Sequence, residues 1–229
     1  MRLPHACGAP VVSGRLILIR HGEPVGHAGR CIGHHDTELA PSAIEPLERL
    51  SRTNSVNARL IIASDLRRAA ASAAIVARAW NAELRFDPRL RELSFGQWEG
   101  RPWDEIARDD ADAIDVWGRD WTVHSAPGGE TGTVFAARVG AALRDANELT
   151  ASADVAVVSH AGWIRVATTI LLAEPLASAF DRSIDYARAA VFNLSGVRPV
   201  LEQWNVEGFD APRITNASVP PQAPSSTRP

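Results

Sequence analysis

The stretch LILIRHGEP, residues 16–24, places four apolar side chains directly before an arginine, a histidine and a glycine. A continuous apolar run of this length is typical of a strand covered on both faces, as in a parallel sheet between helices. Arg20 and His21 then stand at the end of that strand. The pair either closes the strand at the surface or belongs to a site that handles an anion.

Two further runs have the same apolar character, LIIA at 60–63 and VAVV at 155–158. Around them, apolar residues recur with the period of an amphipathic helix over 66–80, 130–150 and 161–173. This alternation of strands and helices predicts an α/β fold, a three-layer α/β/α sandwich with a mostly parallel central sheet.

Two late segments, 187–194 and 197–204, have strand character and are expected to form a hairpin at a sheet edge. The stretch 101–126 differs, because it holds three tryptophans among six aspartates and one glutamate. We expect it to be a helical insertion that caps the sheet. Its aromatic rings are expected to be packing anchors, since an acidic segment would repel nucleic acid.

The expected organisation is a single domain over 15–209 that includes this insertion. An N-terminal extension, 1–14, precedes the domain. The last residues, 210–229, are rich in proline and serine and are expected to be disordered.

The composition excludes several classes of protein. The net charge of −3 argues against a nucleic-acid partner. The chain has no lysine, so its 24 basic residues are all arginine, and chemistry that needs a lysine amine is excluded. Cys7 and Cys31 are too few for a disulfide framework or a zinc site. No apolar run reaches transmembrane length, so we expect a cytoplasmic protein with no membrane association.

Each of the three apolar runs ends in polar residues. The carboxyl ends of parallel strands meet at one edge of the sheet, where α/β proteins bind ligands, and helix N-termini there favour anions. Histidines and arginines gathered at such an edge indicate a phosphate site. The residues concerned are Arg20 and His21 after the first run, Ser64, Asp65, Arg67 and Arg68 after the second, and Ser159 and His160 after the third.

Four motifs in this order resemble those of the histidine phosphatase superfamily, the phosphoglycerate-mutase-like enzymes. The resemblance covers roughly residues 15–205 and implies a phosphoglycerate-mutase-like fold. The motifs are IRHGE at 19–23, SDLRRAAASA at 64–73, LRELSFGQWEG at 90–100 and VSHAGWIR at 158–165.

The resemblance implies a role for each matching residue. His21 would be the nucleophile that forms a phosphohistidine, and Glu92 the general acid and base. Arg20 and Arg68, with His160 as a further catalytic and phosphate-binding residue, would hold the phosphoryl oxygens. Because these side chains supply the positive charge, no metal and no cofactor is expected.

Two further stretches resemble the α-ribazole-phosphatase-like branch of the family, GRCIGHHDTEL at 29–39 and APGGET at 126–131, the latter followed by Arg138. This chain departs from the branch pattern at Ile32, at Thr37-Glu38 and at Pro46, where a proline should kink or shorten a helix. Glu23 and Asn193 are candidates for contact with the substrate beyond its phosphate.

Simpler interpretations exist for several of these residues. Glu92 could be a surface charge paired with Arg89 or Arg91. Ser64 and Asp65 could cap the following helix, and Arg67 is expected to face solvent. His34, His35 and Asp36 invite a metal-site interpretation, although adjacent loop histidines are usually solvated.

The leading functional hypothesis is a metal-independent phosphomonoesterase for a small phosphorylated metabolite. Candidate substrates are α-ribazole phosphate and a sugar or carboxylic-acid phosphate. The alternatives are a phosphomutase and, in another class, a catalytically silent module that binds phospho-ligands. A phosphatase of phosphohistidine proteins is a further variant. Either a monomer or a homodimer is compatible with the sequence.

Overall fold

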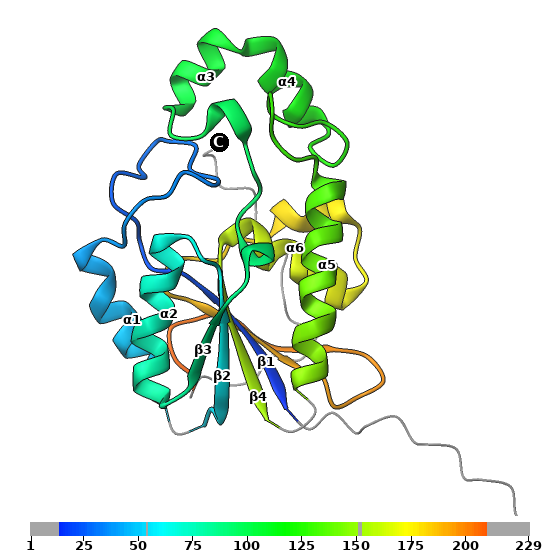
Figure 1. Ribbon diagram of the computed structural model, residues 1–229. Helices are drawn as coiled ribbons and strands as arrows, with labels where there is room; N and C mark the ends of the chain where they lie inside the picture. Colours follow the sequence, from blue (N-terminus) through cyan, green and yellow to red (C-terminus); the bar gives the residue numbers. More distant parts are fainter. Residues whose placement is uncertain (1–13, 54, 151–152, 210–229) are drawn as a thin grey trace, which may run out of the picture.

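The computed structural model describes residues 14–53, 55–150 and 153–209 (Figure 1). The predictions of an N-terminal extension and of a disordered tail concern residues outside these ranges, apart from Gly14.

A six-stranded sheet forms the centre of the fold, with strand order β3-β2-β4-β1-β5-β6. The pairs β1–β4, β2–β4 and β2–β3 are parallel, whereas β1–β5 and β5–β6 are antiparallel. The mostly parallel sheet and the edge hairpin are therefore confirmed. The strands are β1 (Arg15–Arg20), β2 (Ala58–Ala63), β3 (Glu83–Phe86), β4 (Asp154–Ser159), β5 (Ala189–Asn193) and β6 (Val200–Val206).

Helices cover both faces of the sheet, with α1 and α2 on one face and α5 and α6 on the other (Figure 1). This arrangement confirms the three-layer sandwich. The helices are α1 (Ile44–Ser51), α2 (Arg67–Trp80), α3 (Trp103–Asp109), α4 (Ala111–Arg119), α5 (Gly132–Leu149) and α6 (Ala161–Leu172). Short 3-10 turns are η1 (Pro41–Ala43), η2 (Pro88–Leu90), η3 (Gly96–Trp98) and η4 (Leu176–Asp181).

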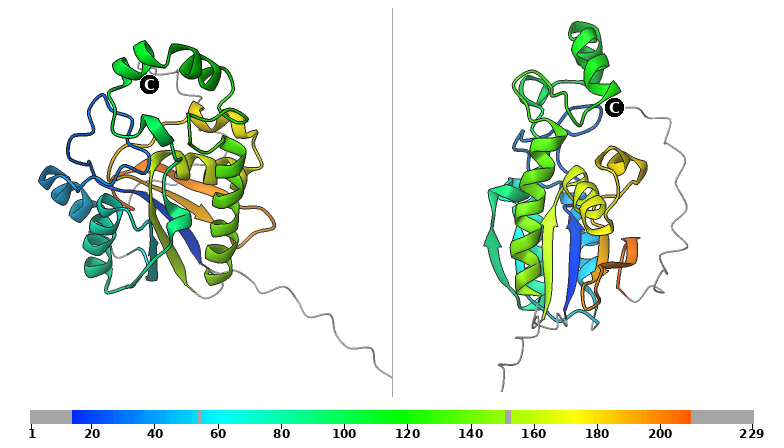
Figure 2. Two further views of the ribbon diagram at one scale, coloured as in Figure 1. Left: turned by 45° about the horizontal axis from the view of Figure 1, so that its top comes forward. Right: turned by 90° about the vertical axis from the view of Figure 1, so that its right-hand side faces the viewer.

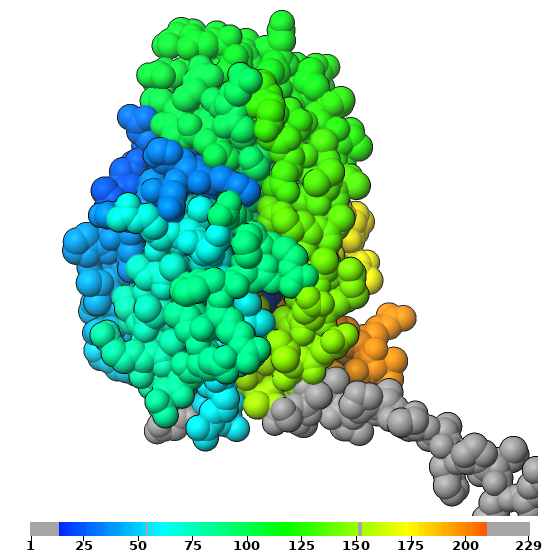
Figure 3. Space-filling model, in the orientation of Figure 1, coloured from blue at the N-terminus to red at the C-terminus, as the bar shows by residue number. Residues whose placement is uncertain are grey.

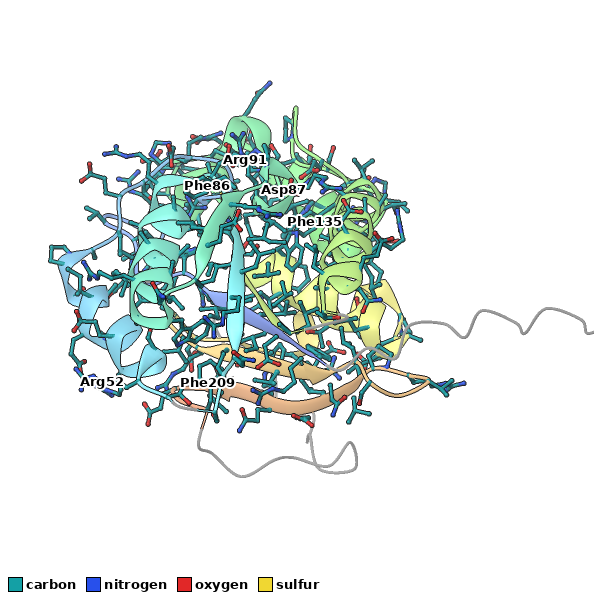
Figure 4. All side chains as sticks on the ribbon, turned by 60° about the horizontal axis from the view of Figure 1, so that its bottom comes forward. Arg52, Phe86, Asp87, Arg91, Phe135 and Phe209 are labelled. Carbon is teal, nitrogen blue, oxygen red and sulfur yellow. The ribbon has the colours of Figure 1, made fainter. Side chains whose placement is uncertain are left out.

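The apolar run of β1 serves both layers, because successive side chains of a strand point to opposite faces. Leu16 and Leu18 pack in the cluster under α5 and α6, whereas Ile17 and Ile19 pack in the cluster under α1 and α2. All four are fully buried. Figure 4 labels one aromatic residue of each cluster, Phe135 on α5 and Phe209 after β6. Burial on both faces explains why the run has no polar interruption.

The start of α2 corrects one interpretation of the sequence. The helix begins at Arg67. The backbone N–H of Arg67 donates to Oδ1 of Asp36, which comes from a distant loop, with the nitrogen 2.7 Å from the oxygen. Asp65 instead pairs with Arg91, so Ser64 and Asp65 do not cap this helix. Pro46 lies in the first turn of α1. The backbone N–H groups of this turn have no partner within the helix, so a proline there costs no intrahelical hydrogen bond. The helix is only eight residues long.

The insertion at 101–126 contains two short helices, α3 and α4. Figures 1 and 2 show them at one end of the molecule, beyond the carboxyl ends of the parallel strands, and Figure 3 shows this end next to the loop that follows β1. Backbone bonds join the two segments: Cys31 donates to Arg101 and Trp103 donates to Gly29. The rings of Trp98 and Trp117 pack edge to face 6.0 Å apart, which confirms that the tryptophans are packing anchors.

The amino end of β4 supplies a test of stability. Asp154 is largely buried and accepts hydrogen bonds from the backbone N–H and guanidinium of Arg15 and from the N–H of Asn57. Asp154→Ala leaves these donors without an acceptor, and we expect a loss of about 2–3 kcal/mol in the free energy of unfolding. Urea denaturation measures it, with exposed Asp112→Ala on α4 as the control. Equal stability of both variants would contradict this role.

Candidate active site

His21 is held at the carboxyl end of β1 by its backbone. Its N–H donates to the carbonyl of Ser159 at 2.9 Å, and the next N–H, of Gly22, donates to Ser72 Oγ at 3.0 Å. A Cβ at Gly22 would lie 2.6 Å from the Cβ of Ala43, so only glycine lets the chain pass this close to the helical layer. The end of the strand is therefore rigidly positioned.

The hydrogen bonds of His21 define which ring nitrogen carries the proton. Nδ1 lies 2.6 Å from the Gly22 carbonyl, which can only accept, so Nδ1 is the protonated nitrogen. Nε2 carries the lone pair and lies 3.3 Å from Nε of Arg68. Burial, followed by the charges of Arg68 and Arg20, holds the pKa of His21 well below its ordinary value of 6.5. The imidazole is therefore neutral at pH 7.

Arg68 comes from the first turn of α2 and is 1% exposed. Its two terminal nitrogens donate to the carbonyls of Gly33 at 2.7 Å and His35 at 2.9 Å, which fix the plane of the guanidinium beside His21. The neighbouring Arg67 is exposed and pairs with Glu38 on the surface, as expected. The resemblance had assigned the phosphate-binding position to Arg68 rather than Arg67, and the structure brings Arg68 to His21.

Arg20, the last residue of β1, lies near the ring of His21. It donates to the carbonyl of Ile184 at 2.6 Å, and its guanidinium carbon lies over the ring of Tyr186, 3.6 Å from the centroid. Its Nε is buried and has no hydrogen-bond partner in the described structure. Tyr186 also lies 5.5 Å from the ring of His21. The stacked tyrosine thus fixes the orientation of the guanidinium while leaving Nε free.

His160 stands at the N-cap position of α6 and is 1% exposed. Its ring lies 4.8 Å from that of His21, and Nε2 is 2.9 Å from Ser64 Oγ. Nδ1 is buried and has no partner among the described residues. Burial, followed by the nearby His21 and Arg68, lowers the pKa of His160 well below 6.5. The ring therefore keeps one nitrogen that no described residue engages.

Glu92 reaches the site through the amino end of α6. Its carboxylate accepts from the N–H of Gly162 at 3.0 Å and of Trp163 at 3.1 Å. A carboxylate there is stabilised by the helix dipole. Arg89 pairs with Asp87 and Asp145, and Arg91 pairs with Asp65, so the interpretation of Glu92 as their surface partner is wrong.

The segment that carries Glu92 is fixed from behind by Arg138 on α5. This arginine donates to the carbonyls of Arg89, Arg91 and Glu92 at 2.8–3.0 Å. It is held by Glu130, which also accepts from the N–H of Ser94. The branch-like APGGET stretch and Arg138 therefore have a structural function, which is to orient the backbone around Glu92.

The two predicted substrate-side residues have different positions. Glu23 lies close to the cluster, half exposed, with its carboxylate 3.3 Å from Ser42 Oγ and 3.6 Å from His27. Asn193 is at the opposite end of the sheet, because β5 runs antiparallel to β1 and pairs Asn193 with Arg15. Its side chain donates to Glu202 there. The assignment of Asn193 to the substrate side is therefore wrong.

The loop histidines do not form a metal site. His34 contacts the carbonyl of Glu92, His35 uses its carbonyl for Arg68, and Asp36 caps α2. Within residues 14–53, 55–150 and 153–209, no group of three histidine, cysteine or acidic residues could hold a metal ion. In the same ranges no helix has the length and apolarity needed to cross a membrane.

The sequence did not indicate the roles of Tyr186 and Gly162, nor the hydrogen bond between Ser64 and His160. Tyr186 is the chain's single tyrosine but belongs to none of the four motifs. Gly162 lies inside VSHAGWIR, yet its purpose depends on Glu92: a Cβ there would be 2.4 Å from Glu92 Oε1. Such close approaches between distant segments leave no local pattern in a sequence.

The site brings together five of the predicted residues: Arg20, His21, Arg68, Glu92 and His160. It offers one neutral imidazole whose Nε2 lone pair accepts a long hydrogen bond from Arg68, two guanidinium groups, a second histidine with an unpartnered ring nitrogen, and one carboxylate. An imidazole in this state can act as a nucleophile, and the cations can stabilise a tetrahedral or planar oxyanion beside it.

Comparisons with known proteins agree with this geometry. The family model of the histidine phosphatase superfamily (branch 1) matches residues 16–207. An adenosylcobalamin/alpha-ribazole phosphatase of Escherichia coli (strain K12) is 30% identical over 174 residues, which are 75% of this chain and 85% of that protein. The chain belongs to the histidine phosphatase superfamily, which confirms the resemblance, and it is a phosphatase of that superfamily.

Solved structures give the same result at the level of the fold. The alpha-ribazole phosphatase from Shigella flexneri superposes with a TM-score of 0.80 at 27% identity, covering 86% of this chain and 98% of the other. A mycobacterial glucosyl-3-phosphoglycerate phosphatase has a TM-score of 0.73 at 26% identity, covering 85% and 99%. The similarity to the α-ribazole-phosphatase-like branch is thus confirmed in sequence and structure.

The two buried histidines predict how stability depends on pH. Both pKa values are lowered on folding, so below about pH 6.5 the unfolded chain binds more protons and the folded state loses stability as pH falls. Each histidine contributes a slope of up to about 1.4 kcal/mol per pH unit. Urea denaturation between pH 7.5 and 5.5 measures this slope.

The His160→Asn variant should reduce the slope by about half, because it removes one of the two proton acceptors. Exposed His124→Asn is the control and should keep the full slope. An unchanged slope in His160→Asn would show that His160 does not resist protonation.

Proposed function

We propose that this phosphatase hydrolyses small phosphomonoesters through a phosphohistidine on His21, without a metal ion or other cofactor. The observation that carries the proposal is the state of the His21 ring, with Nδ1–H bound to the Gly22 carbonyl and the Nε2 lone pair beside Arg68. A neutral ring nitrogen among buried cations is an activated nucleophile for an anionic phosphoryl group.

In the first step, Nε2 of His21 attacks phosphorus and the bond to the leaving alkoxide breaks. Arg20, Arg68 and His160 hold the phosphoryl oxygens, because their free or partly free donors converge beside the ring. Glu92, acting as the general acid, donates a proton to the alkoxide. In the second step Glu92 takes a proton from water, the oxygen attacks phosphorus, and His21 is released with inorganic phosphate.

The proposed substrates are small phosphorylated metabolites, either α-ribazole phosphate or a sugar or carboxylic-acid phosphate. The names of the relatives support both, since one group is described as α-ribazole phosphatases and one solved structure as a glucosyl-3-phosphoglycerate phosphatase. A cytoplasmic location, a monomeric or homodimeric state, and the absence of nucleic-acid and membrane partners belong to the same proposal.

The nucleophile is tested by phosphate release in EDTA from p-nitrophenyl phosphate, α-ribazole phosphate and 3-phosphoglycerate. We expect the wild type to be active with EDTA and His21→Ala to lose at least about 10³-fold in kcat, because the covalent route is removed. His124→Ala on the surface serves as the control.

Each alternative has its own outcome in this assay. Full activity of His21→Ala would overturn the nucleophile, and a strict magnesium requirement would overturn the metal-independent scheme. Acid-labile phosphate on His21 with isomerised product and no free phosphate would identify a phosphomutase. Binding of phospho-ligands without any turnover would identify a silent binding module.

The position of Glu92 can be tested through Gly162. In Gly162→Ala the new Cβ would lie 2.4 Å from Oε1, so the carboxylate must move. We expect kcat/KM for an alkyl phosphate to fall about 10²-fold, because its alkoxide needs a proton. The value for p-nitrophenyl phosphate should change much less, since its phenoxide leaves without one.

Gly118→Ala on α4 is the matched control, because a Cβ there meets nothing within 4 Å. Glu92→Gln should reproduce the same dependence on the leaving group. Equal losses on both substrates in Gly162→Ala would mean that the displaced carboxylate does not protonate the leaving group.

A further inference from the structure

Arg165 is a charged group of the interior that the reaction scheme does not use. It lies on α6, one turn after Ala161. The two residues therefore share one face of the helix, close to its amino end. Arg165 is half-buried, and its Nε is fully buried without a hydrogen-bond partner in the described structure. A buried N–H of a guanidinium without an acceptor is costly.

The other arginines show how unusual this is. Buried or half-buried arginines of the described chain donate to a carboxylate or a carbonyl, as Arg68 does. Besides Arg165, the described arginines without an acceptor in the protein are all exposed. They are Arg52, Arg59, Arg78, Arg144 and Arg198. Arg165 therefore lacks both a protein partner and full access to water.

The neighbours of Arg165 place it beside the active site. The charges that act on it are those of Arg20 and Glu92, both members of the site cluster. Burial and the charge of Arg20 lower its pKa, and Glu92 acts in the opposite direction. The carboxylate of Glu92 is already engaged by Gly162 and Trp163, so it is not a direct partner.

Two aromatic rings, Phe180 and Trp121, lie near Arg165. The guanidinium of Arg165 lies 5.6 Å from the ring of Phe180 on η4, and that ring packs edge to face on Trp121 of the insertion at 4.8 Å. Phe180 is 46% exposed. Arg165 thus lies within electrostatic range of Arg20 and Glu92, with its guanidinium over the ring of Phe180. Since Glu92 is the proposed proton donor to the leaving group, a second anion on that group would come near Arg165.

We propose that Arg165 binds a second anionic group of the substrate, a carboxylate or a second phosphate carried by the leaving group. This inference rests on the proposed function, because it extends the same site. The second anion accepts a hydrogen bond from Arg165, which has no acceptor in the described part of the protein. The guanidinium is partly desolvated, so a charge-assisted hydrogen bond there is strong. It favours phosphorylated carboxylic acids and bisphosphates over α-ribazole phosphate, whose leaving group carries no anion.

Matched substrates test the proposal. 3-Phosphoglycerate and glycerol 3-phosphate differ by one carboxylate, and fructose 1,6-bisphosphate and fructose 6-phosphate differ by one phosphate. We expect the wild type to prefer the doubly anionic member of at least one pair in kcat/KM. Arg165→Gln should lower that preference about 10- to 100-fold, which is the contribution of a hydrogen bond between charged groups. The pair that responds identifies the anion.

Two further variants separate this role from a structural one. Arg165→Lys keeps the charge and should restore part of the preference, whereas Arg144→Gln on α5 removes an exposed arginine and should leave it unchanged. Arg165→Met should raise the midpoint of thermal unfolding, because it removes a half-buried charge that has no partner in the described structure. A structural role would lower that midpoint.

The same comparison by calorimetry uses His21→Ala, which cannot turn over, and His21→Ala/Arg165→Gln. Selective loss of affinity for the doubly anionic ligands supports the proposal even if hydrolysis is not observed. Absence of hydrolysis would by contrast overturn the proposed function. No preference for the second anion in the wild type, or an equal loss on both members of each pair in Arg165→Gln, would overturn the role of Arg165.

Discussion

The short hydrogen bond from His21 Nδ1 to the carbonyl of its own neighbour, Gly22, determines how the other groups of the site can act. It uses the ring proton, so the second nitrogen must present a lone pair toward Arg68. It also depends on a backbone that passes very close to Ala43, which glycine alone allows. If the proton moved to the other nitrogen, Arg68 would face an N–H group and the pair would repel. The tautomer thus links the end of one strand to the side chain of a helix that begins 46 residues later.

Charge around this ring is distributed so that the cations stay available. Most surface arginines pair with acids, whereas Arg20 and Arg68 are held by the carbonyls of Ile184, Gly33 and His35. A carbonyl fixes a guanidinium without neutralising it, so the positive charge remains for a ligand. Glu92 is likewise kept from these cations, because the amino end of α6 binds its carboxylate. Cations and acid therefore coexist within one buried cluster without forming ion pairs with one another.

The sequence predicted the layers, the parallel core of the sheet and five residues that the structure brings together, since each is encoded locally by an apolar run, a helical period or a motif. It did not predict β3, whose charged and mostly exposed residues resemble a loop. It also misplaced Asn193, because the position of a residue along an antiparallel edge strand depends on register, which local patterns do not define. Capping of α2 by Asp36, stacking of Tyr186 on Arg20 and the missing partner of Arg165 are properties of contacts between distant segments.

The loop after β1 has two separate attachments. One part, around Gly29 and Cys31, is bonded to the base of the cap, and the next part supplies the carbonyls of Gly33 and His35 to Arg68. A change that tilts the insertion at 101–126 to suit a new substrate would therefore also strain the support of Arg68. The shape of the substrate-facing end of this enzyme is thus tied to the support of Arg68. Adaptive substitutions in the cap should need compensating changes in residues 29–36 to keep the enzyme active.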